Sequence, residues 1–348
     1  MNAYEKVRAL GEGQFGVVKL YRHKDTGEEF AGKKIKLRLH GSDGINFSAI
    51  REMKALQETE HPNVVALRRV VHHKTTLILL YEYCWTDLEA VIKDKSLAIP
   101  EGAVKGFMLQ IMTGLSYLHR SYLLHRDIKP SNVLVDAKGV VKLTDFGLSR
   151  PYGSPQRLLS PQVVTQWYKA PELLYGARHY GEGIDLWALG CVFAELMLRA
   201  PYLPGTSDID QLGKIFAALG TPTEADWPDM HTLPSYVEFQ FCPRPALRNL
   251  FRSASPEALD LLQGLMRFDP KKRIRARDAL QHAYLGSASP APAPPDQLPL
   301  PAPRKKKAAE RRPTGGTKRK LPRLDFGEAV GGEASTKRRR TVSQSADK

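Results

Sequence analysis

Side chains suited to phosphoryl transfer follow one another in the middle of the chain. Asp127 and Lys129 stand in the run His125-Arg126-Asp127-Ile128-Lys129-Pro130-Ser131-Asn132, and Asp145 opens Asp145-Phe146-Gly147. The Asp127 carboxylate could accept the proton of an attacking hydroxyl, and Lys129 could neutralise charge on the transferred group. Asn132 and Asp145 offer hard oxygen ligands of the kind that Mg²⁺ prefers. These residues predict a metal-assisted phosphoryl-transfer site rather than a set of solvated loop charges.

A glycine-rich run near the N-terminus could cover the phosphates of a nucleotide. Gly11-Glu12-Gly13-Gln14-Phe15-Gly16-Val17-Val18 has the pattern G-x-G-x-x-G-x-V, which alone is equally typical of a tight hairpin without function. Lys33 falls on the third predicted strand, where it could reach the α- and β-phosphates, and Glu52 on the following helix could pair with it. A solvated strand lysine is the alternative for Lys33, and it describes the adjacent Lys34 better.

The elements that must position these groups divide into a small strand-rich part and a larger helical part. Apolar and alternating runs predict strands at residues 11–20, 29–37, 64–71 and 76–83, with a turn at Asp25-Thr26-Gly27. Apolar residues at helical spacing predict helices at 47–57, around 104–118, and at 183–198, 208–219, 256–268 and 277–284.

The composition favours a protein without a membrane span or a disulfide framework. The chain has 348 residues, of which 42% are hydrophobic and 26% charged, as expected of one large or two modest globular units. Its longest apolar stretch, residues 184–198, is interrupted by charged residues and is too short to span a bilayer. Cys84, Cys191 and Cys242 have no metal-like spacing and indicate a reducing compartment. The N-terminal residues lack the pattern of a signal peptide.

A basic tail is expected after Gly286. From Ser287 onward the chain has 15 Lys and Arg against 6 Asp and Glu, so most of the net charge of +15 lies there. The segment has few apolar residues and is expected to be disordered. Its basic clusters, at residues 304–307, 318–320 and 337–340, could be nuclear import signals, nucleic-acid contacts or merely solubilising. Import fits best, because almost no aromatic side chains are present for base stacking.

Ala170-Pro171-Glu172 completes a series of motifs whose order is specific. With the glycine run, the Lys33 strand and the two central motifs before it, residues 4–286 resemble a eukaryotic protein kinase. The resemblance implies an α+β, bilobal fold with an N-lobe at 1–81, a hinge at 82–87, a helical C-lobe at 88–286 and a disordered basic tail at 287–348. It also implies transfer of a phosphoryl group from ATP to Ser or Thr hydroxyls, with Mg²⁺ as cofactor.

Further runs resemble one branch of this family, the cyclin-dependent kinases of the CDK-activating type, and most of all the D-type form of plants and algae. Residues 46–52 resemble the cyclin-contacting helix, and the match continues in residues 86–89, 153–155, 162–165, 207–216, 227–230 and 236–241 and extends to residues 297–299. The resemblance implies a cyclin partner of the H type, an assembly subunit and the transcription factor TFIIH. Its implied substrates, in the nucleus, are the activation loops of other cyclin-dependent kinases and the C-terminal domain of RNA polymerase II. Neither a membrane nor sequence-specific nucleic acid is expected as a partner.

The same resemblance implies which residues surround ATP. Tyr81 would be the gatekeeper, the Glu82 carbonyl and the Cys84 backbone would contact adenine, and Asp87 would contact the ribose or the substrate. The Cys84 thiol is interpreted as inert, because hinge contacts are made by the backbone and nothing basic flanks it. The other expected contacts to ATP are Leu10, Gly11, Glu12, Gly13, Gln14, Phe15, Gly16, Val18, Ala31, Lys33 and Glu52.

Three arginines match the family's phosphate cradle. Arg51, Arg126 and Arg150 would bind a phosphate on Ser160, the activating site, and Ser154 would be a secondary phosphorylation site. Each charge-assisted hydrogen bond to the phosphate is worth about 1.5–3 kcal/mol, so two or three would be enough to order a loop.

The chain departs from the family pattern at a few positions. Ser160 replaces the usual Thr, and Pro161 after it gives the site the form that proline-directed kinases recognise. Gln166 and Lys169 replace arginines, and because Lys lacks the guanidinium fork, a preference for proline after the target residue is left open. Gly32 replaces a β-branched residue and should loosen its strand modestly.

Two other functions compete with this interpretation. A non-catalytic scaffold or cyclin-binding module would not need Lys33, Asp127, Asn132 and Asp145 to be intact, as they are here. A MAP kinase would carry a Thr-x-Tyr pair in its activation segment, where this chain has Leu158-Leu159-Ser160-Pro161-Gln162.

Overall fold

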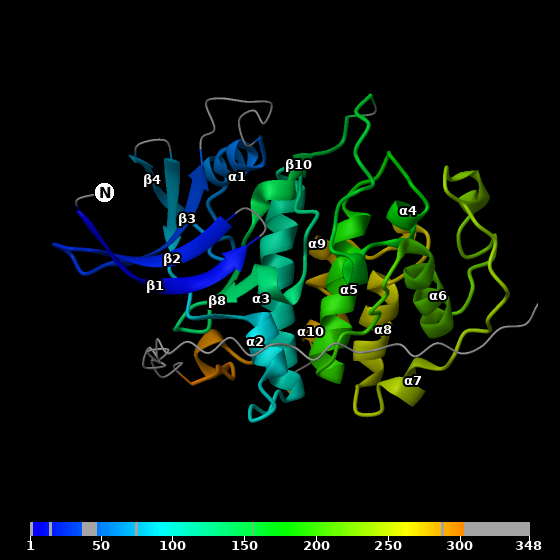
Figure 1. Cartoon of the computed structure of the whole chain (residues 1–348). Helices are drawn as coiled ribbons and strands as arrows, with labels where there is room; N and C mark the ends of the chain where they lie inside the picture. Colours follow the sequence, from blue (N-terminus) through cyan, green and yellow to red (C-terminus); the bar gives the residue numbers. More distant parts are fainter. Residues whose placement is uncertain are drawn as a thin grey trace, which may run out of the picture. The chain divides into compact units, whose positions relative to one another are not determined.

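A five-stranded antiparallel sheet and one helix form the small lobe (Figure 1). The computed structural model describes residues 3–13, 16–36, 47–73, 76–154, 156–286 and 289–302. The strands lie in the order β1-β2-β3-β5-β4. Their bounds are Tyr4–Gly13 (β1), Gly16–His23 (β2), Glu29–Lys36 (β3), Leu67–His73 (β4) and Thr76–Glu82 (β5), and α1 spans Phe47–Gln57, as predicted.

Alternation along β5 gives this sheet two apolar faces. Ile78 and Leu80 pack with Tyr21 and Phe30 on one face, whereas Tyr81 belongs to the main core on the other. Successive side chains of a strand point to opposite faces. Tyr81 therefore lies on the face that α1 covers, where its hydroxyl reaches a residue of that helix.

The glycine-rich run forms a hairpin and not a single strand. The strand predicted at residues 11–20 is wrong, because β1 ends at Gly13 and β2 begins at Gly16, and these two glycines are partners across the hairpin. Alternation continues on both sides of such a turn, so the pattern alone cannot locate it.

Gly32 does not loosen β3 in the way that its sequence suggests. A Cβ at this position would lie 2.3 Å from the Tyr21 ring, so the ring already fills the space that a side chain would occupy. Gly32 is also paired on both sides, with Lys19 of β2 and Leu80 of β5. The missing side chain is thus compensated by a larger neighbour.

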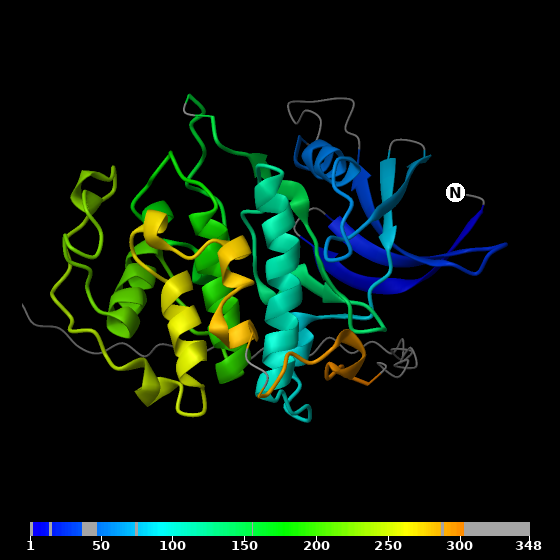
Figure 2. The same ribbon diagram turned by 180° about the vertical axis from the view of Figure 1, so that it is seen from behind.

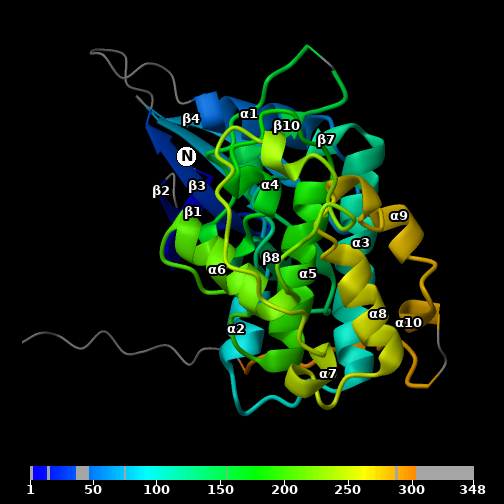
Figure 3. The same ribbon diagram turned by 90° about the vertical axis from the view of Figure 1, so that its right-hand side faces the viewer.

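Helices make up most of the large lobe, with α5 at its centre between α6 and α8 (Figure 3). The predicted helices at 183–198 and 208–219 are confirmed by α5 (Gly183–Leu198) and α6 (Asp208–Leu219). The other helices are α2 (Leu88–Lys93), α3 (Glu101–Arg120), α4 (Pro171–Leu174), α7 (Leu247–Leu250), α8 (Pro256–Leu265), α9 (Ala276–Ala279) and α10 (Ala283–Gly286). Within the described ranges, no helix combines the length and apolarity needed to cross a membrane.

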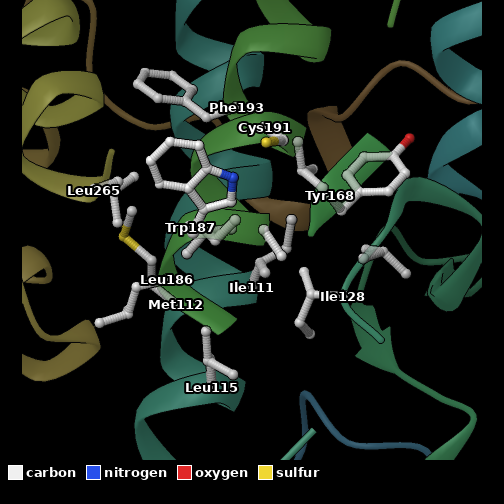
Figure 4. Close-up of a cluster of buried hydrophobic side chains, with 14 of the residues drawn as sticks. Ile111, Met112, Leu115, Ile128, Tyr168, Leu186, Trp187, Cys191, Phe193 and Leu265 are labelled. Carbon is white, nitrogen blue, oxygen red and sulfur yellow. The ribbon is translucent and has the colours of Figure 1, made fainter. Parts of the chain in front are cut away.

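The core of the large lobe forms around α5, which is buried on nearly all sides. Trp187 and Cys191 of α5 lie near Ile111 of α3, and Leu115 belongs to the same cluster further along α3 (Figure 4). Ile128 joins the same cluster from the loop that carries Asp127. A close-packed interior transmits position well, so this core fixes the loop from below.

Two short sheets hold the loops that bear the predicted catalytic residues. One contains β6 (Thr86–Asp87), β8 (Val133–Val135) and β9 (Val141–Leu143); in the other, β7 (Leu123–Leu124) pairs with β10 (Arg150–Pro151). Asp127 lies between β7 and β8, and Asp145 lies between β9 and β10. Both loops therefore begin and end on paired strands.

Two predicted helices have other bounds. The single helix expected at 277–284 is divided into α9 and α10, and α8 ends at Leu265 rather than at residue 268. Ala276, Ala279 and Tyr284 are all buried, so the apolar pattern continues across the break and does not reveal it. Beyond Leu265, the backbone of Met266 leaves the helical conformation.

Residues 289–302, which the sequence assigns to the disordered tail, pack across the first turns of α3 as a strap (Figure 2). The Ala293 N–H donates to the Gly102 carbonyl at 2.8 Å, and the Trp85 indole N–H donates to the Pro301 carbonyl at 3.1 Å. Leu298 is only 6% exposed. The compact part of the chain therefore continues through the strap, past the boundary predicted at residue 286. Composition missed the strap because a proline-rich segment can be ordered by the surface beneath it. The basic clusters at 304–307, 318–320 and 337–340 lie outside the described residues.

The strap packs so closely on α3 that one position of the helix has no room for a side chain. A Cβ added to Gly106 would come within 2.4 Å of the Ala293 carbonyl oxygen. We predict that Gly106→Ala lowers the free energy of unfolding by about 1–3 kcal/mol through overpacking, although Ala is intrinsically the better helix former by about 1 kcal/mol. Gly213→Ala in α6 is the matched control, because nothing lies within 4 Å of its new Cβ. Denaturant unfolding of the full chain measures both; equal stability of the two variants would contradict the packing of the strap.

Candidate active site

Asp127 lies at the centre of a hydrogen-bonded cluster and is only 3% exposed. Its Oδ2 accepts from the Asn132 side-chain amide at 2.8 Å and lies 2.8 Å from Lys129 Nζ. Its Oδ1 accepts from the Thr165 hydroxyl at 2.9 Å. The structure thus brings Asp127, Lys129 and Asn132 together, as their spacing predicts, and holds the carboxylate in one orientation.

Thr165 is a member of this cluster that the sequence did not indicate as a site residue. Besides donating to Asp127, its hydroxyl accepts from Lys129 Nζ at 2.9 Å. It lies 38 residues beyond Asp127, in the segment before Trp167, so no local motif joins the two. A hydroxyl residue close before Ala170-Pro171-Glu172 was the one available signal.

A second cluster joins the small lobe to the loop that bears Asp145. Lys33 Nζ donates to Glu52 Oε2 at 2.8 Å and to Asp145 Oδ1 at 3.1 Å. Lys33 and Glu52 are 6% and 2% exposed. Burial opposes the charge of Lys33, but the carboxylates of Glu52 and Asp145 outweigh it and raise the pKa of the amino group. Lys33 therefore stays charged near neutral pH, as the predicted pairing requires.

Tyr81 gives Glu52 a further partner. Its hydroxyl donates to Glu52 Oε1 at 2.7 Å, so the two carboxylate oxygens are bound from two different strands. Burial, and then the nearby Glu52 charge, raise the pKa of Tyr81 well above its usual value. The hydroxyl is thus a permanent donor in the working pH range.

The donor set near Asp145 suits a magnesium ion better than a transition metal. Among the described residues, no group of three or more His, Cys, Asp or Glu side chains is placed to hold a metal. Asn132 donates its side-chain amide to Asp127, so its side-chain oxygen is not used in that bond, and Asp145 adds one carboxylate. Mg²⁺ takes few protein carboxylates and completes its octahedron with phosphates and water, so these residues fit it.

The loop of Asp127 is anchored from beneath by Asp185 of α5. Asp185 accepts from the backbone N–H of His125 at 2.9 Å and of Arg126 at 2.8 Å, and contacts His119 Nε2 at 3.0 Å. Burial opposes its charge, but the hydrogen bonds from His119 and Arg126 hold the pKa of the carboxyl below its usual range. In the sequence, Asp185 is one of the charged residues that interrupt the apolar stretch at 184–198. A charge in such a run was the signal that it has buried partners.

Left-handed backbone occurs at three non-glycine positions next to these residues, and at three others in the described part of the chain. Arg126, Asp145 and Val164 have φ of 66°, 65° and 67°, a left-handed conformation that costs non-glycine residues energy and persists only when the surroundings fix it. The Asp185 bonds to the backbone next to Asp127 provide such fixation for Arg126. Glu172 of Ala170-Pro171-Glu172 is itself held in place by Arg273 in a buried pair with two hydrogen bonds of 2.6 and 2.7 Å.

The residues expected around adenine lie on neighbouring strands and in the segment after β5. Leu10, Val18 and Ala31 are partly exposed on β1, β2 and β3. A Cβ on Gly11 would meet nothing within 4 Å, so no contact with the described residues requires glycine there. Of the glycine run, Gly13 and Gly16 are placed by their strands, as is the backbone of Glu12, and Gln14 and Phe15 lie outside the described residues.

In the segment after β5, Cys84 has a buried thiol and Asp87 caps a helix. Burial raises the pKa of the Cys84 thiol to about 12, so the thiol stays protonated near neutral pH, in agreement with the inert interpretation. The Asp87 carboxylate accepts from the Ala90 N–H at 2.8 Å and caps α2. Its expected contact with a ribose would be made in addition to this cap.

Arg51, Arg126 and Arg150 converge on the activation segment. Arg51 donates to the Gly147 carbonyl at 2.9 Å, and Arg126 donates to the Leu148 carbonyl at 2.7 Å. Within the described ranges, no carboxylate forms an ion pair with any of the three. Burial, and then the charges of Arg51, Arg126 and Arg157, lower the pKa of Arg150 to about 10. Burial and the charge of Arg126 likewise lower the pKa of Arg51. The cluster thus has an excess of positive charge that an anion would relieve.

Ser160 is exposed at the edge of this cluster. Tyr180 links them: its hydroxyl donates to the Ser160 carbonyl at 2.6 Å and accepts from Arg126 at 2.8 Å. Ser154 lies elsewhere, on the wall of a pocket of about 280 Å³ that Arg157 and Tyr180 also line. The two serines predicted as phosphorylation sites are therefore both near arginines, but only Ser160 has a described link to Arg126.

Comparisons with known proteins agree with this geometry. The protein kinase domain family matches residues 4–285. The chain is 50% identical to cyclin-dependent kinase 7 of Xenopus laevis over 286 residues, which cover 82% of this chain and 81% of that protein. It is 49% identical to cyclin-dependent kinase D-1 of Arabidopsis thaliana over 285 residues, covering 82% of this chain and 71% of that one. A solved chain of the CAK complex from Chaetomium thermophilum, bound to ATP-γ-S, superimposes with a TM-score of 0.81 at 38% identity, over 86% of this chain and 96% of that chain.

Proposed function

We propose that this chain, which belongs to the cyclin-dependent kinases of the protein kinase family, is the catalytic subunit of a CDK-activating kinase. It transfers the γ-phosphoryl group of ATP to Ser or Thr hydroxyls of activation loops in other cyclin-dependent kinases and of the C-terminal domain of RNA polymerase II. The observation that supports the proposal is the pair of buried clusters, one around Asp127 and one around Lys33. We propose that together they supply a proton acceptor, a phosphate-binding cation and two oxygen ligands.

Each of these residues has its own role in the proposed transfer. The substrate hydroxyl oxygen attacks the γ-phosphorus, the bond from that phosphorus to the bridging oxygen of ADP breaks, and Asp127 accepts the hydroxyl proton. Lys129, 2.8 Å from Asp127, stabilises charge that develops on the transferred group. Lys33 binds the α- and β-phosphates while Glu52 holds it in place. The protein thus acts mainly by positioning and electrostatics.

ATP and magnesium are the proposed cofactors. Asn132 and Asp145 would hold Mg²⁺, which when bound neutralises phosphate charge. The Glu82 carbonyl and the Cys84 backbone would bind adenine, between Leu10, Val18 and Ala31. Glu12, Gln14 and Phe15 of the glycine run would cover the phosphates.

A cyclin is the proposed partner, and α1 its contact. Ile50 on α1 is an apolar side chain that is 41% exposed. The buried apolar residues described on the same helix already pack on the core; they are Ala49, Ala55 and Leu56. An exposed apolar side chain beside a buried face is what a partner helix would cover. We propose an H-type cyclin, an assembly subunit and TFIIH as the wider complex.

Gln166 and Lys169 support a modified substrate contact. Both side chains bind the same oxygen of Asp208, at the start of α6, at 3.0 and 3.2 Å. The arginines they replace could form a bidentate fork, whereas this arrangement uses one amide and one ammonium group. We propose that proline is still accepted after the target residue, next to the left-handed backbone of Val164.

Nuclear localisation is proposed from the basic clusters of the tail. Clusters of this size act as import signals, and residues 304–307 begin directly after the strap. The proposed substrates are nuclear, so import and function agree.

The function is tested with the full chain purified in complex with an H-type cyclin. We expect ATP-dependent phosphorylation of a cyclin-dependent kinase activation loop and of polymerase C-terminal repeats. Asp127→Asn keeps the volume of the side chain but removes the proton acceptor, and should lower turnover at least about 100-fold. Asp94→Asn is the matched control, because Asp94 is a loop residue that binds Ser96; its turnover should be unchanged. A non-catalytic scaffold would give no turnover in any of these proteins.

Phosphorylation of Ser160 is predicted to relieve repulsion in the arginine cluster. The pKa of Arg150 is lowered in the folded protein, so its charged form opposes folding at neutral pH, and this cost fades only as the pH rises above about 10. Arg150→Met should therefore raise the melting temperature of the unphosphorylated chain. A phosphate on Ser160 should stabilise the wild-type chain more than the Arg150→Met variant, and should raise cyclin-bound activity more as well.

Comparison of phosphorylated and unphosphorylated protein by thermal unfolding and by turnover checks this prediction. Another cyclin-dependent kinase can supply the phosphate, because Pro161 follows Ser160. Ser154→Ala is the control for the secondary site and should change little. An equal phosphate effect in wild type and Arg150→Met would show that Arg150 does not bind it.

A further inference from the structure

Glu52 is held by two donors that come from two neighbouring strands. Lys33 of β3 binds Oε2 at 2.8 Å, and the Tyr81 hydroxyl of β5 binds Oε1 at 2.7 Å. All three residues are at least 94% buried. Each oxygen of the carboxylate therefore has its own partner in a site from which water is excluded.

Sheet geometry explains why Tyr81 can do this. Ala31 of β3 is the cross-strand partner of Tyr81 in β5, and Lys33 lies two residues beyond Ala31 on the same face. Tyr81 and Lys33 are thus diagonal neighbours, within reach of one carboxylate. Because β5 is an inner strand, paired with both β3 and β4, the Tyr81 ring has a rigid support.

The Tyr81 bond does not depend on the other groups that position α1. Lys33 divides its hydrogen bonds between Glu52 and Asp145, and ATP phosphates would compete for the same ammonium group. Arg51 on α1 reaches the Gly147 carbonyl, but this residue is also part of the arginine cluster. The Tyr81 hydroxyl has Glu52 as its described acceptor and stays protonated.

We propose that Tyr81 is a positioning residue for the kinase reaction: its hydroxyl latches Glu52, and with it α1, in the arrangement that pairs Glu52 with Lys33. The latch raises the fraction of molecules with a competent small lobe before a cyclin binds. Cyclin binding then increases the competent fraction by a smaller factor. A ligand shifts the equilibrium between the competent and incompetent states only by its differential affinity for them.

The size of the effect follows from the chemistry of the bond. A buried hydrogen bond to a carboxylate favours the latched state about 10- to 100-fold. Removal of the hydroxyl should therefore reduce the activity of the chain alone by about 10-fold or more. In the cyclin complex the partner holds α1 as well, so the loss there should stay below about 3-fold.

The test compares Tyr81→Phe with wild type in the full chain, with and without a saturating H-type cyclin. Tyr81→Phe keeps the ring and removes only the oxygen. Tyr168→Phe is the matched control, because the Tyr168 hydroxyl also donates to a buried glutamate, Glu195, at 2.7 Å, but in the large lobe. Both variants should lose comparable thermal stability, whereas only Tyr81→Phe should raise the ratio of cyclin-bound to cyclin-free kcat.

Hydrogen exchange of the α1 amides, residues 47–57, gives a readout that does not depend on turnover. We expect faster exchange in cyclin-free Tyr81→Phe and no change in Tyr168→Phe. Equal loss of kcat in both cyclin states, or a higher KM for ATP in both with unchanged kcat, would overturn the latch and leave Tyr81 as a contact to adenine. An unchanged ratio and unchanged exchange would overturn it too.

This inference rests on the proposed dependence on a cyclin, and wild type tests that dependence separately. If cyclin does not stimulate the wild-type chain at all, the proposed function fails. If cyclin stimulates wild type and Tyr81→Phe by the same factor, only the latch fails.

Discussion

The Glu52 carboxylate lies inside the small lobe with 2% of its surface exposed, where an unpaired charge would be prohibitively costly. The carboxylate must therefore lie where Lys33 can pair with it, and Lys33 also binds Asp145. These two bonds join three separate parts of the molecule: the sheet, α1 and the loop after β9. Most other features of the site serve to bring these three parts to the same point.

In the large lobe, Asp127 is held in position by a different buried carboxylate. Asp185 of the apolar helix α5 binds the backbone of the Asp127 loop, so the loop takes its position from a helix that is buried on nearly all sides. The strained backbone of Arg126 is held at the same place. Replacement of Glu52 or of Asp185 by an apolar residue would leave buried polar groups without partners. Buried polar networks of this kind are rigid when all of their members are paired.

Sequence patterns predicted the groups of the site that are adjacent along the chain. Asp127, Lys129 and Asn132 lie within six residues and form one cluster, and α1, α5 and α6 have the bounds that apolar periodicity predicts. Tertiary partners were missed, because nothing local connects Thr165 to Asp127 or Tyr81 to Glu52. Breaks that keep the apolar period, as between α9 and α10, were also missed. The strap was assigned to the tail because its composition resembles a linker, whereas its order comes from the surface of α3 and from Trp85.

The central claim is that Glu52 acts in catalysis through Lys33, and a double-mutant cycle tests it most directly. The values of kcat/KM are measured for the cyclin-bound wild type, Lys33→Met, Glu52→Gln and the double variant. If Glu52 acts only by positioning Lys33, the double variant should be no slower than Lys33→Met alone, because groups that work as a unit are not additive. If the two losses multiply in the double variant, the residues act independently, and that result would contradict a positioning role for Glu52.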